Sequence, residues 1–501
     1  MKKINIQVLW CMWALLLLLS GNAIAQKHDY NWVMGMHEFP GAPGYNNALL
    51  HFSPNGIQVE QLDLKMNFEA TATAMSDSAG QLLFYTNGCE IANALGETMQ
   101  GGIGLNPGEI HEWVCNQTGY ISPRGAMAIP VPGSNHVYYL FHMGLRYDPY
   151  RKTTLGPFYF TEIDMGVNGG KGAVTSKNNL LTDGDLEPFT AVRHGNGRDW
   201  WLVIPVYGGQ EYRLFLVTPV GIEGPFLQNI GSLMNCRHLG TNVFSLDGQK
   251  FARAQNCKVA VMDFDRCTGR FSSPQVLDLP IGVIGGGGVA FSPDNQRLLV
   301  SAQLQILEAD LATSSPILDS AFVWNYQWGV SLQHMQYTPF GQIAMNHMHR
   351  AQYLSLIGKP SLSSDSMGFE PKGISLPIYS VRTLPNYPNY RLYDVPGSPC
   401  DSLGINTPVV NTTTPMLPKE GPLQIFPNPG SETVQFQRPS DATGELCLMD
   451  QTGKIMLTKA VFSAATVLDL TEFPAGIYWA MVKERDGVRV GKIVIVQAPR
   501  D

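Results

Sequence analysis

The sequence has few charged residues and no basic cluster. Asp, Glu, Lys and Arg make up only 15% of its 501 residues, and the formal net charge is −7. Lys and Arg are scattered along the chain, whereas a nucleic-acid-binding protein usually gathers them on one face. Nucleic acid is therefore not expected as a partner.

The sequence also lacks the common catalytic and cofactor motifs. It contains no Gly-x-Ser-x-Gly elbow, and His111-Glu112 is not followed by the second His of a zinc protease motif. The glycine run 285–288 is not followed by the Lys-Ser/Thr of a phosphate loop, and no two Cys have CxxC spacing. The sequence thus predicts no catalytic residue, no metal and no cofactor.

The only long apolar run lies at the N-terminus. Lys2 and Lys3 precede an apolar stretch over residues 8–19, and Ala23-Ile24-Ala25 places small residues where signal peptidase cleaves. A membrane anchor is the alternative, but about a dozen apolar residues are too few for a span of about 20. We therefore predict a Sec signal peptide over residues 1–25, a mature chain from Gln26 without a transmembrane segment, and an extracellular location.

Glycine, proline and aromatic residues are abundant. The chain has 51 Gly, 34 Pro, 22 Phe, 19 Tyr and 9 Trp. Tight turns use Gly and Pro, and strands favour aromatic residues, so the composition predicts an all-β protein.

A turn followed by an apolar strand recurs along residues 26–395. The two clearest copies are Ser245-Leu-Asp-Gly-Gln-Lys-Phe-Ala and Ser292-Pro-Asp-Asn-Gln-Arg-Leu-Leu. Further copies start at Ser76, Pro132, His194 and Thr338, so the unit recurs about every 50 residues, as in a β-propeller blade. We expect about seven blades, with the two ends of this region sharing one blade. A large β-sandwich is the alternative, although it would not require a period.

Several of these stretches resemble a known kind of propeller. The turn Phe291-Ser-Pro-Asp is similar to the signature of WD40-like and YVTN-type β-propellers. Residues 76–88 and 190–201 resemble secreted WD40-like proteins of gliding and related Gram-negative bacteria. The resemblance supports the fold and says little about function.

The composition changes after Val395. Residues 396–421 are rich in Pro and Thr, which predicts an extended linker. Short alternating strands then follow over residues 422–501, which predicts a small Ig-like β-sandwich.

This last part resembles the type A C-terminal sorting domain of the type IX secretion system. The resemblance rests on Phe426-Pro-Asn-Pro-Gly430, Leu468-Asp-Leu, Phe473-Pro-Ala-Gly-Ile-Tyr478 and Lys492-Ile-Val-Ile-Val496. It implies that Pro427, Asn428, Pro429, Gly476, Tyr478 and Lys492 belong to the sorting signal. It also implies recognition by outer-membrane secretion machinery, removal of the domain, and attachment of the body to surface lipopolysaccharide. An ordinary Ig-like appendage is the alternative.

Seven cysteines follow the signal segment, and export favours disulfides. Cys89 and Cys115 bracket a Gly-rich loop, and Cys257 and Cys267 flank one strand and its turn, so both pairs are disulfide candidates. The odd total leaves at least one thiol unpaired.

Two groups of polar residues are candidates for a ligand site in the channel. Asp183, Asp185 and Glu187 alternate along the chain, as oxygen ligands of calcium can, although a solvated acidic turn is the simpler explanation. His347 and His349 would point to one side of a strand, with His334 in the preceding strand. Structural histidines are the simpler interpretation.

These observations favour a non-enzymatic, secreted or surface-attached propeller that binds a glycan, a peptide or a protein partner. The alternative is a secreted hydrolase or lyase with its site at the central channel, since propellers host both functions. A structural role on the cell surface is a third hypothesis. Clustering of the acidic and His candidates in one pocket would favour the enzyme.

Overall fold

The computed structural model describes the chain from Gln26 to Val496, with gaps. The described residues are 26–36, 46–148, 152–234, 236, 239–280, 287–323, 331–363, 366–403, 423–437, 444–450, 455–461, 463, 465–484 and 487–496. The predicted signal peptide 1–25 and most of the predicted linker lie outside them. None of the described helices has the length and apolarity needed to cross a membrane.

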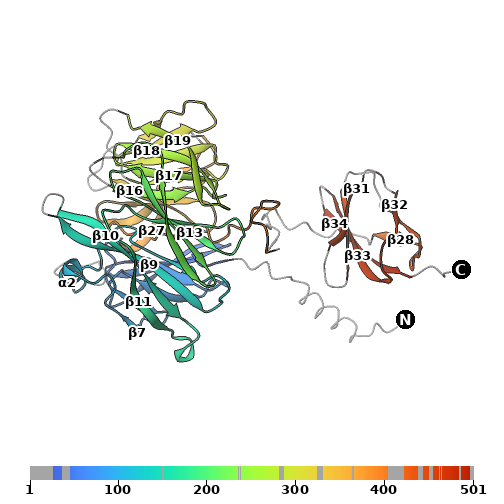
Figure 1. Ribbon diagram of the computed structural model, residues 1–501, viewed down its shortest axis with the longest axis horizontal. Coiled ribbons are helices and arrows are strands. Elements are labelled where there is room, and N and C mark those ends of the chain that lie inside the picture. The colour runs from blue at the N-terminus through green and yellow to red at the C-terminus, as the bar shows by residue number, and fades with distance from the viewer. Residues whose placement is uncertain are drawn as a thin grey trace. The chain divides into compact units, whose positions relative to one another are not determined.

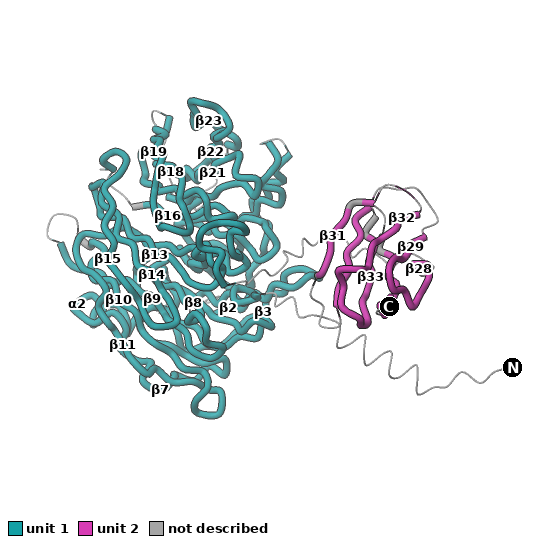
Figure 2. The backbone as a smooth tube through the Cα atoms, turned by 45° about the vertical axis from the view of Figure 1, so that its right-hand side comes forward, with its two compact units in different colours: residues 1–407 teal, residues 408–501 magenta. Residues whose placement is uncertain are grey.

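The chain divides into two compact units, Met1–Thr407 and Pro408–Asp501 (Figure 2). The described strands of the first unit form seven antiparallel blades around a common axis (Figure 1). The β7 strand of one blade pairs in parallel with β11 of the next, through Gln100 and Ala173, so these two blades form one eight-stranded sheet. The seven blades confirm the predicted propeller.

The strands of the seven blades are, in chain order: blade 1, β1 (Asn31–Gly35), β2 (Asn47–Ser53) and β3 (Gly56–Leu62); blade 2, β4 (Thr73–Ser76), β5 (Leu82–Thr86), β6 (Glu90–Asn93) and β7 (Thr98–Ile103); blade 3, β8 (Ala126–Pro130), β9 (Val137–Asp148), β10 (Lys152–Asp164) and β11 (Ala173–Thr182); blade 4, β12 (Thr190–Arg193), β13 (Trp200–Pro205), β14 (Glu211–Thr218) and β15 (Gly221–Asn229); blade 5, β16 (Leu239–Phe244), β17 (Lys250–Gln255), β18 (Lys258–Asp265) and β19 (Arg270–Asp278); blade 6, β20 (Val289–Phe291), β21 (Arg297–Ala302), β22 (Gln305–Asp310) and β23 (Asp319–Val323); blade 7, β24 (Leu332–Tyr337), β25 (Ile343–His347), β26 (Ala351–Ile357) and β27 (Phe369–Ser380). The short helices α2 (Glu109–Val114) and η1 (Asn168–Gly170) lie between strands of blades 2 and 3.

The recurring turn joins the first strand of a blade to the second. In blade 5 the Ser245 hydroxyl donates to Asp247 at 2.6 Å and accepts the N–H of Lys250 at 2.9 Å, while Asp247 accepts the N–H of Gln249 at 3.0 Å. Such side-chain bonds to the local backbone stabilise a tight turn without outside partners. All six predicted turns occupy this position, in blades 2 to 7.

The strand after each turn is apolar because it is covered on both faces. In blade 4, every residue of β13 is buried, whereas the outermost strand β15 is largely exposed. The sequence of a strand enclosed by neighbouring blades is a continuous apolar run, whereas a strand with one exposed face alternates apolar and polar residues. This burial pattern explains why the sequence shows the turn and second strand of each blade most clearly.

An extended stretch of chain, residues 381–395, follows the last blade and lies along the propeller axis; we call it the axial segment. Its Tyr387 hydroxyl accepts the N–H of Ala74 in β4 at 3.1 Å and donates to the carbonyl of Asn31 in β1 at 3.0 Å. The Tyr387 N–H donates to the Gln336 side chain in β24 at 3.2 Å. One residue therefore contacts the innermost strands of three blades.

Neighbouring residues of the axial segment contact the other side of the ring. The Asn386 amide donates to the carbonyls of Arg124 and Phe189, which precede β8 and β12, at 3.0 and 3.3 Å. The Tyr390 hydroxyl donates to the carbonyl of Ala128 in β8 at 2.5 Å. Tyr390 is fully buried, and Asn386 is 1% exposed. The central channel is thus filled by the protein's own chain.

The axial segment leaves the ring at the end where the recurring turns lie. The N–H of Val395 donates to the carbonyl of Gly195, in the turn of blade 4, at 2.8 Å. Beyond it, Cys400 forms a disulfide with Cys267, in the turn between β18 and β19. A Cβ at Gly195 would lie 2.5 Å from the Cys400 sulfur, so this close approach requires glycine. Residues 396–403, which the sequence places in the linker, are fastened to the propeller by this disulfide.

The two ends of the propeller meet at blade 1, but not as the shared sheet that we expected. Among the described strands, blade 1 contains β1 to β3 only, and the axial segment lies against β1 without pairing with it. Pro385 and Pro388 lack the N–H that a strand ladder needs. Side chains such as Tyr387 therefore make the connection that backbone pairing makes in a regular blade.

The second unit is a small Ig-like β-sandwich, as predicted. One sheet has the order β28-β29-β32 and the other β31-β30-β33-β34. Their bounds are β28 (Gln424–Phe426), β29 (Thr433–Gln437), β30 (Gly444–Met449), β31 (Ile455–Val461), β32 (Ala465–Asp469), β33 (Gly476–Glu484) and β34 (Gly487–Ile495). Side chains from both sheets, including Phe436, Leu448 and Ile493, form a separate apolar core.

Replacing Tyr387 by Phe tests the role of the axial segment. The change removes one hydroxyl and leaves the N–H of Ala74 without its partner in a site where Ala74 is fully buried. We expect Tyr387→Phe to lower the free energy of unfolding by about 1–3 kcal/mol, measured by urea unfolding. Tyr147→Phe is the control, expected to change it by about 0.5 kcal/mol or less, because Tyr147 is 62% exposed. Equal effects of the two changes would contradict this role.

Candidate functional site

The three acidic candidates do not form one site. Glu187 is 1% exposed and pairs with the buried Arg253 of β17, with both oxygens accepting guanidinium N–H groups at 2.7 and 2.9 Å. Asp183 is exposed and pairs with Arg146, and Asp185 is also exposed. The alternation thus reflects one buried ion pair between blades 4 and 5 and two surface carboxylates.

The three His candidates differ in their environment: His334 and His347 are buried, and His349 is exposed. β25 ends at His347, so His349 falls in the following turn, where it is exposed. The expected placement of both rings on one side of a strand is therefore wrong. His347 is buried, with Nε2 3.3 Å from the Ser355 hydroxyl, and burial lowers its pKa to about 4.

His334 is equally unsuited to titrate near neutral pH. Burial, together with the positive charges of Arg124 and Arg382, lowers the pKa of His334 to about 3. An efficient general base has a pKa near the working pH. His334 and His347 are therefore neutral structural side chains at pH 7.

The disulfides differ in part from the predicted pairs. Cys89 is bonded to Cys115, whereas Cys257 is bonded to Cys236 and not to Cys267. Cys447 is a free thiol. Within the described ranges, the single group of three side chains placed to reach one metal ion is Cys89, His111 and Cys115. Its two sulfurs are joined to each other, so they offer no thiolate ligand.

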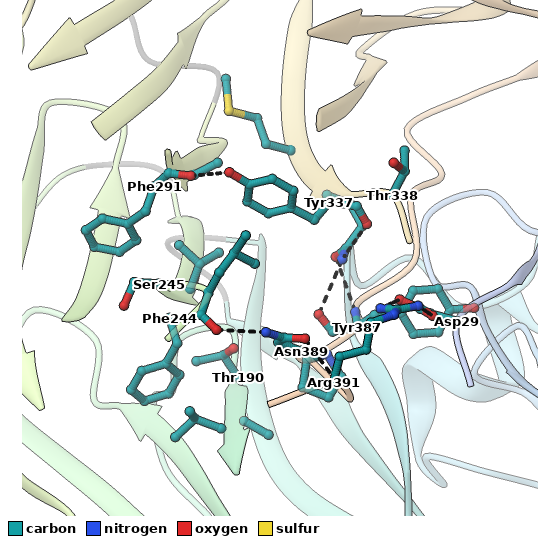
Figure 3. A pocket seen from close by; sticks show the side chains of 18 of the residues that line it. Asp29, Thr190, Phe244, Ser245, Phe291, Tyr337, Thr338, Tyr387, Asn389 and Arg391 are labelled. Carbon is teal, nitrogen blue, oxygen red and sulfur yellow. Dashed lines mark hydrogen bonds and ion pairs between the residues drawn. The ribbon is translucent and has the colours of Figure 1, made fainter. Parts of the chain in front are cut away.

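A pocket remains at the turn end of the channel, beside the axial segment. Its volume is about 240 Å³, and it is lined by the innermost strands of blades 4 to 7, by residues 387–389 and 391 of the axial segment, and by Asp29 and Arg124. Phe244, Ser245 and Phe291 form one wall, and Asn389, Arg391 and Asp29 lie opposite (Figure 3). We call this cavity the axial pocket.

The polar groups of the axial pocket are held in place by neighbours. Asn389 donates to the carbonyl of Leu246 at 2.7 Å, and the Tyr337 hydroxyl donates to the carbonyl of Phe291 (Figure 3). Arg391 donates from both terminal nitrogens to the two oxygens of Asp29, one at 3.0 Å. Burial opposes the charge of Arg391, but the Asp29 carboxylate raises its pKa above the usual value.

Asp29 is the one carboxylate among the lining residues, and it is committed to Arg391. Hydrolysis of a glycosidic bond generally uses two carboxylates, and nucleophilic catalysis needs a nucleophile beside a base. Neither arrangement occurs among the described lining residues. The axial pocket combines fixed polar groups with apolar side chains on a rigid scaffold.

Sequence reasoning did not find the axial pocket. It lies at the channel, as expected for a propeller, but part of its lining comes from residues 387–389 and 391, where we expected the shared blade and not a segment along the axis. The repeated Pro-Asn-Tyr of residues 385–390 was the available signal, because two prolines in six residues argue against a paired strand.

The predicted sorting residues of the second unit lie together, although about 65 residues separate the two parts of the motif. The Asn428 amide donates to the carbonyl of Lys492 at 2.7 Å, and the N–H of Val494 donates to the Asn428 side-chain oxygen at 2.9 Å. The segment 427–429 is thereby fixed along β34. Tyr478 is buried, and its hydroxyl donates to the carbonyl of Pro474 at 2.8 Å.

Residues 424–496 match the family model of the secretion system C-terminal sorting domain. The second unit is a type IX sorting domain. Its presence indicates that the protein is secreted or displayed on the cell surface, and that the type IX secretion machinery takes part in its export. Positions 427–429, 476, 478 and 492, which the sequence singled out, lie within the matched residues.

The whole chain has distant structural relatives. A functionally unknown protein from Desulfotomaculum acetoxidans is 12% identical, with a TM-score of 0.39, over 72% of this chain and 99% of that one. PorZ, a surface component of the type IX secretion system of Porphyromonas gingivalis, is 9% identical, with a TM-score of 0.30, over 91% and 69%. The propeller domain of Cps50 from Myceliophteria thermophila is 10% identical, with a TM-score of 0.36, over 64% and 94%. No curated protein matches the chain. Similarity at these scores carries no argument about function.

The contributions of Glu187 and Asp183 to the free energy of unfolding are expected to differ. Glu187→Gln leaves the buried charge of Arg253 without a counter-charge, so we expect the free energy of unfolding to fall by about 3–5 kcal/mol. Asp183→Asn breaks an exposed pair and should cost about 1 kcal/mol or less. Urea unfolding of both variants checks this, and a calcium-dependent stability lost in Asp183→Asn would instead restore the ligand interpretation.

Proposed function

We propose that this protein is an extracellular, non-enzymatic binding propeller, and that its ligand, a glycan, a peptide or part of a protein, occupies the axial pocket. The observation that carries the proposal is the axial segment. It fills the channel in which a propeller enzyme would hold its substrate, and it leaves a pocket whose one carboxylate already has a partner. Binding needs only the fixed polar groups and the apolar wall that remain.

The proposal also includes the route by which the protein is exported. Residues 1–25 would direct Sec export to the periplasm, and the sorting domain would then be recognised by type IX machinery at the outer membrane and removed. The body would remain attached to surface lipopolysaccharide or be released. The sorting domain and the sequence pattern of residues 1–25 support this route.

The route predicts a size and a location. In native culture we expect the body to appear outside the cell without residues 422–501, measured as intact mass in surface and medium fractions. A chain truncated before residue 422 should stay in the periplasm, because it lacks the Asn428–Lys492 arrangement. Full-length protein outside the cell, regardless of truncation, would overturn the sorting part of the proposal.

The binding function predicts capture without turnover. We expect immobilised full-length protein to retain members of a glycan and peptide panel, and mass spectrometry to recover them unchanged after a day. Thr190→Phe, which places an aromatic ring at the pocket wall, should abolish capture; Val220→Phe, at an exposed turn, should not. Products released by the wild type and absent with Thr190→Phe would favour the hydrolase or lyase instead.

A further inference from the structure

Buried arginines without carboxylate partners gather around the propeller axis. Three arginines, Arg124, Arg193 and Arg266, are at most 7% exposed. They donate to backbone carbonyl or amide oxygens and form no ion pair with a described residue. The protein as a whole carries a net charge of −7. The positive charge at the axis is therefore a local feature.

Arg124 is the one of the three that lines the axial pocket. Its Nη1 donates to the carbonyls of Met335 and Pro385 at 2.9 and 3.2 Å, and its Nη2 donates to the Asn386 side chain at 2.8 Å. A guanidinium has five N–H donors, so two of them, one on Nε and one on Nη2, have no partner within the described part of the chain. Arg124 therefore has hydrogen-bonding capacity that its described neighbours do not use.

The neutral partners of Arg124 leave its charge uncompensated. Burial lowers the pKa of Arg124 to about 9, which still leaves it positive at pH 7. A buried charge without a counter-charge is unfavourable, and it attracts an opposite charge more strongly in a low-dielectric site than in water. The Asp29–Arg391 pair beside it is neutral overall and supplies no such compensation.

The remaining lining limits the size and character of the ligand. The volume of about 240 Å³ is below the roughly 300–1,000 Å³ of pockets for drug-sized molecules. The lining also combines the hydroxyl- and amide-bearing residues Thr190, Ser245, Thr338 and Asn389 with apolar residues such as Phe244 and Phe291. Such a mixture suits a small molecule with several hydroxyl groups.

We propose that the axial pocket binds a small, hydroxylated carboxylate of about the size of a single sugar acid, with its carboxylate directed towards Arg124. The two oxygens of a carboxylate match the two free donors of the guanidinium, as in bidentate pairs. The inference rests on the binding function proposed above and adds the charge and size of the ligand. A peptide would enter the same pocket only through its C-terminal carboxylate.

Calorimetric titration of the full-length protein with glucuronate and with glucose tests this inference, since the two sugars differ at one carboxylate. We expect glucuronate to bind at least tenfold more tightly than glucose. Arg124→Gln should remove this difference. Arg266→Gln is the matched control, because Arg266 is equally buried and bound to carbonyls but does not line the pocket, and it should keep the difference.

Each other result contradicts a defined part of the argument. Equal binding of the two sugars by the wild type would overturn the carboxylate proposal, and this comparison needs no variant to fold. If a peptide with a free C-terminal carboxylate binds and its C-terminal amide does not, while glucuronate fails, the sugar-acid assignment is wrong. If the panel ligands are still captured by Thr190→Phe, the pocket itself is not the site, and the proposed function fails with it.

Discussion

The structure depends on how the axis of the ring is filled. Seven blades leave a channel bordered by innermost strands, and the backbone groups of these strands that face it need partners. Here the partners come from residues 381–395, through long polar side chains and not through sheet pairing. Tyr387 forms hydrogen bonds with blades 1, 2 and 7, while Asn386 and Tyr390 form them with blades 3 and 4. One stretch of chain thus holds both sides of the ring together.

Filling the channel also decides where function can reside. The axial segment occupies the channel beside the axial pocket, and we place the proposed ligand in this pocket. The segment that closes the ring is also a wall of this pocket, through Asn389 and Arg391. A ligand in this pocket would therefore be held by residues that also stabilise the fold, which would give the site the rigidity that recognition by a few polar groups requires.

Features that depend on neighbouring residues could be predicted from the sequence. The turn of Ser245 and Asp247 is complete within six residues, so its pattern reveals the blade period without any knowledge of the ring. The sorting motif could be predicted because its residues resemble the type IX C-terminal sorting domain. The pairing of Cys267 with Cys400 spans 133 residues and follows from where the axial segment leaves the ring. No local pattern carries that information, and the same is true of the Glu187–Arg253 pair, which joins two blades.

The order of these parts along the chain has a physical consequence. The axial segment and Cys400 come after all seven blades and directly before the sorting domain. Until residues 381–400 are present, the carbonyl of Asn31 and the N–H of Ala74 lack the Tyr387 hydroxyl that bonds to both. Blade 1 then also lacks the axial segment that lies against β1. The ring is therefore completed by the last residues of the propeller, and the sorting signal is made only after the stretch that completes it. A chain that carries the signal already contains every residue that the closed ring requires.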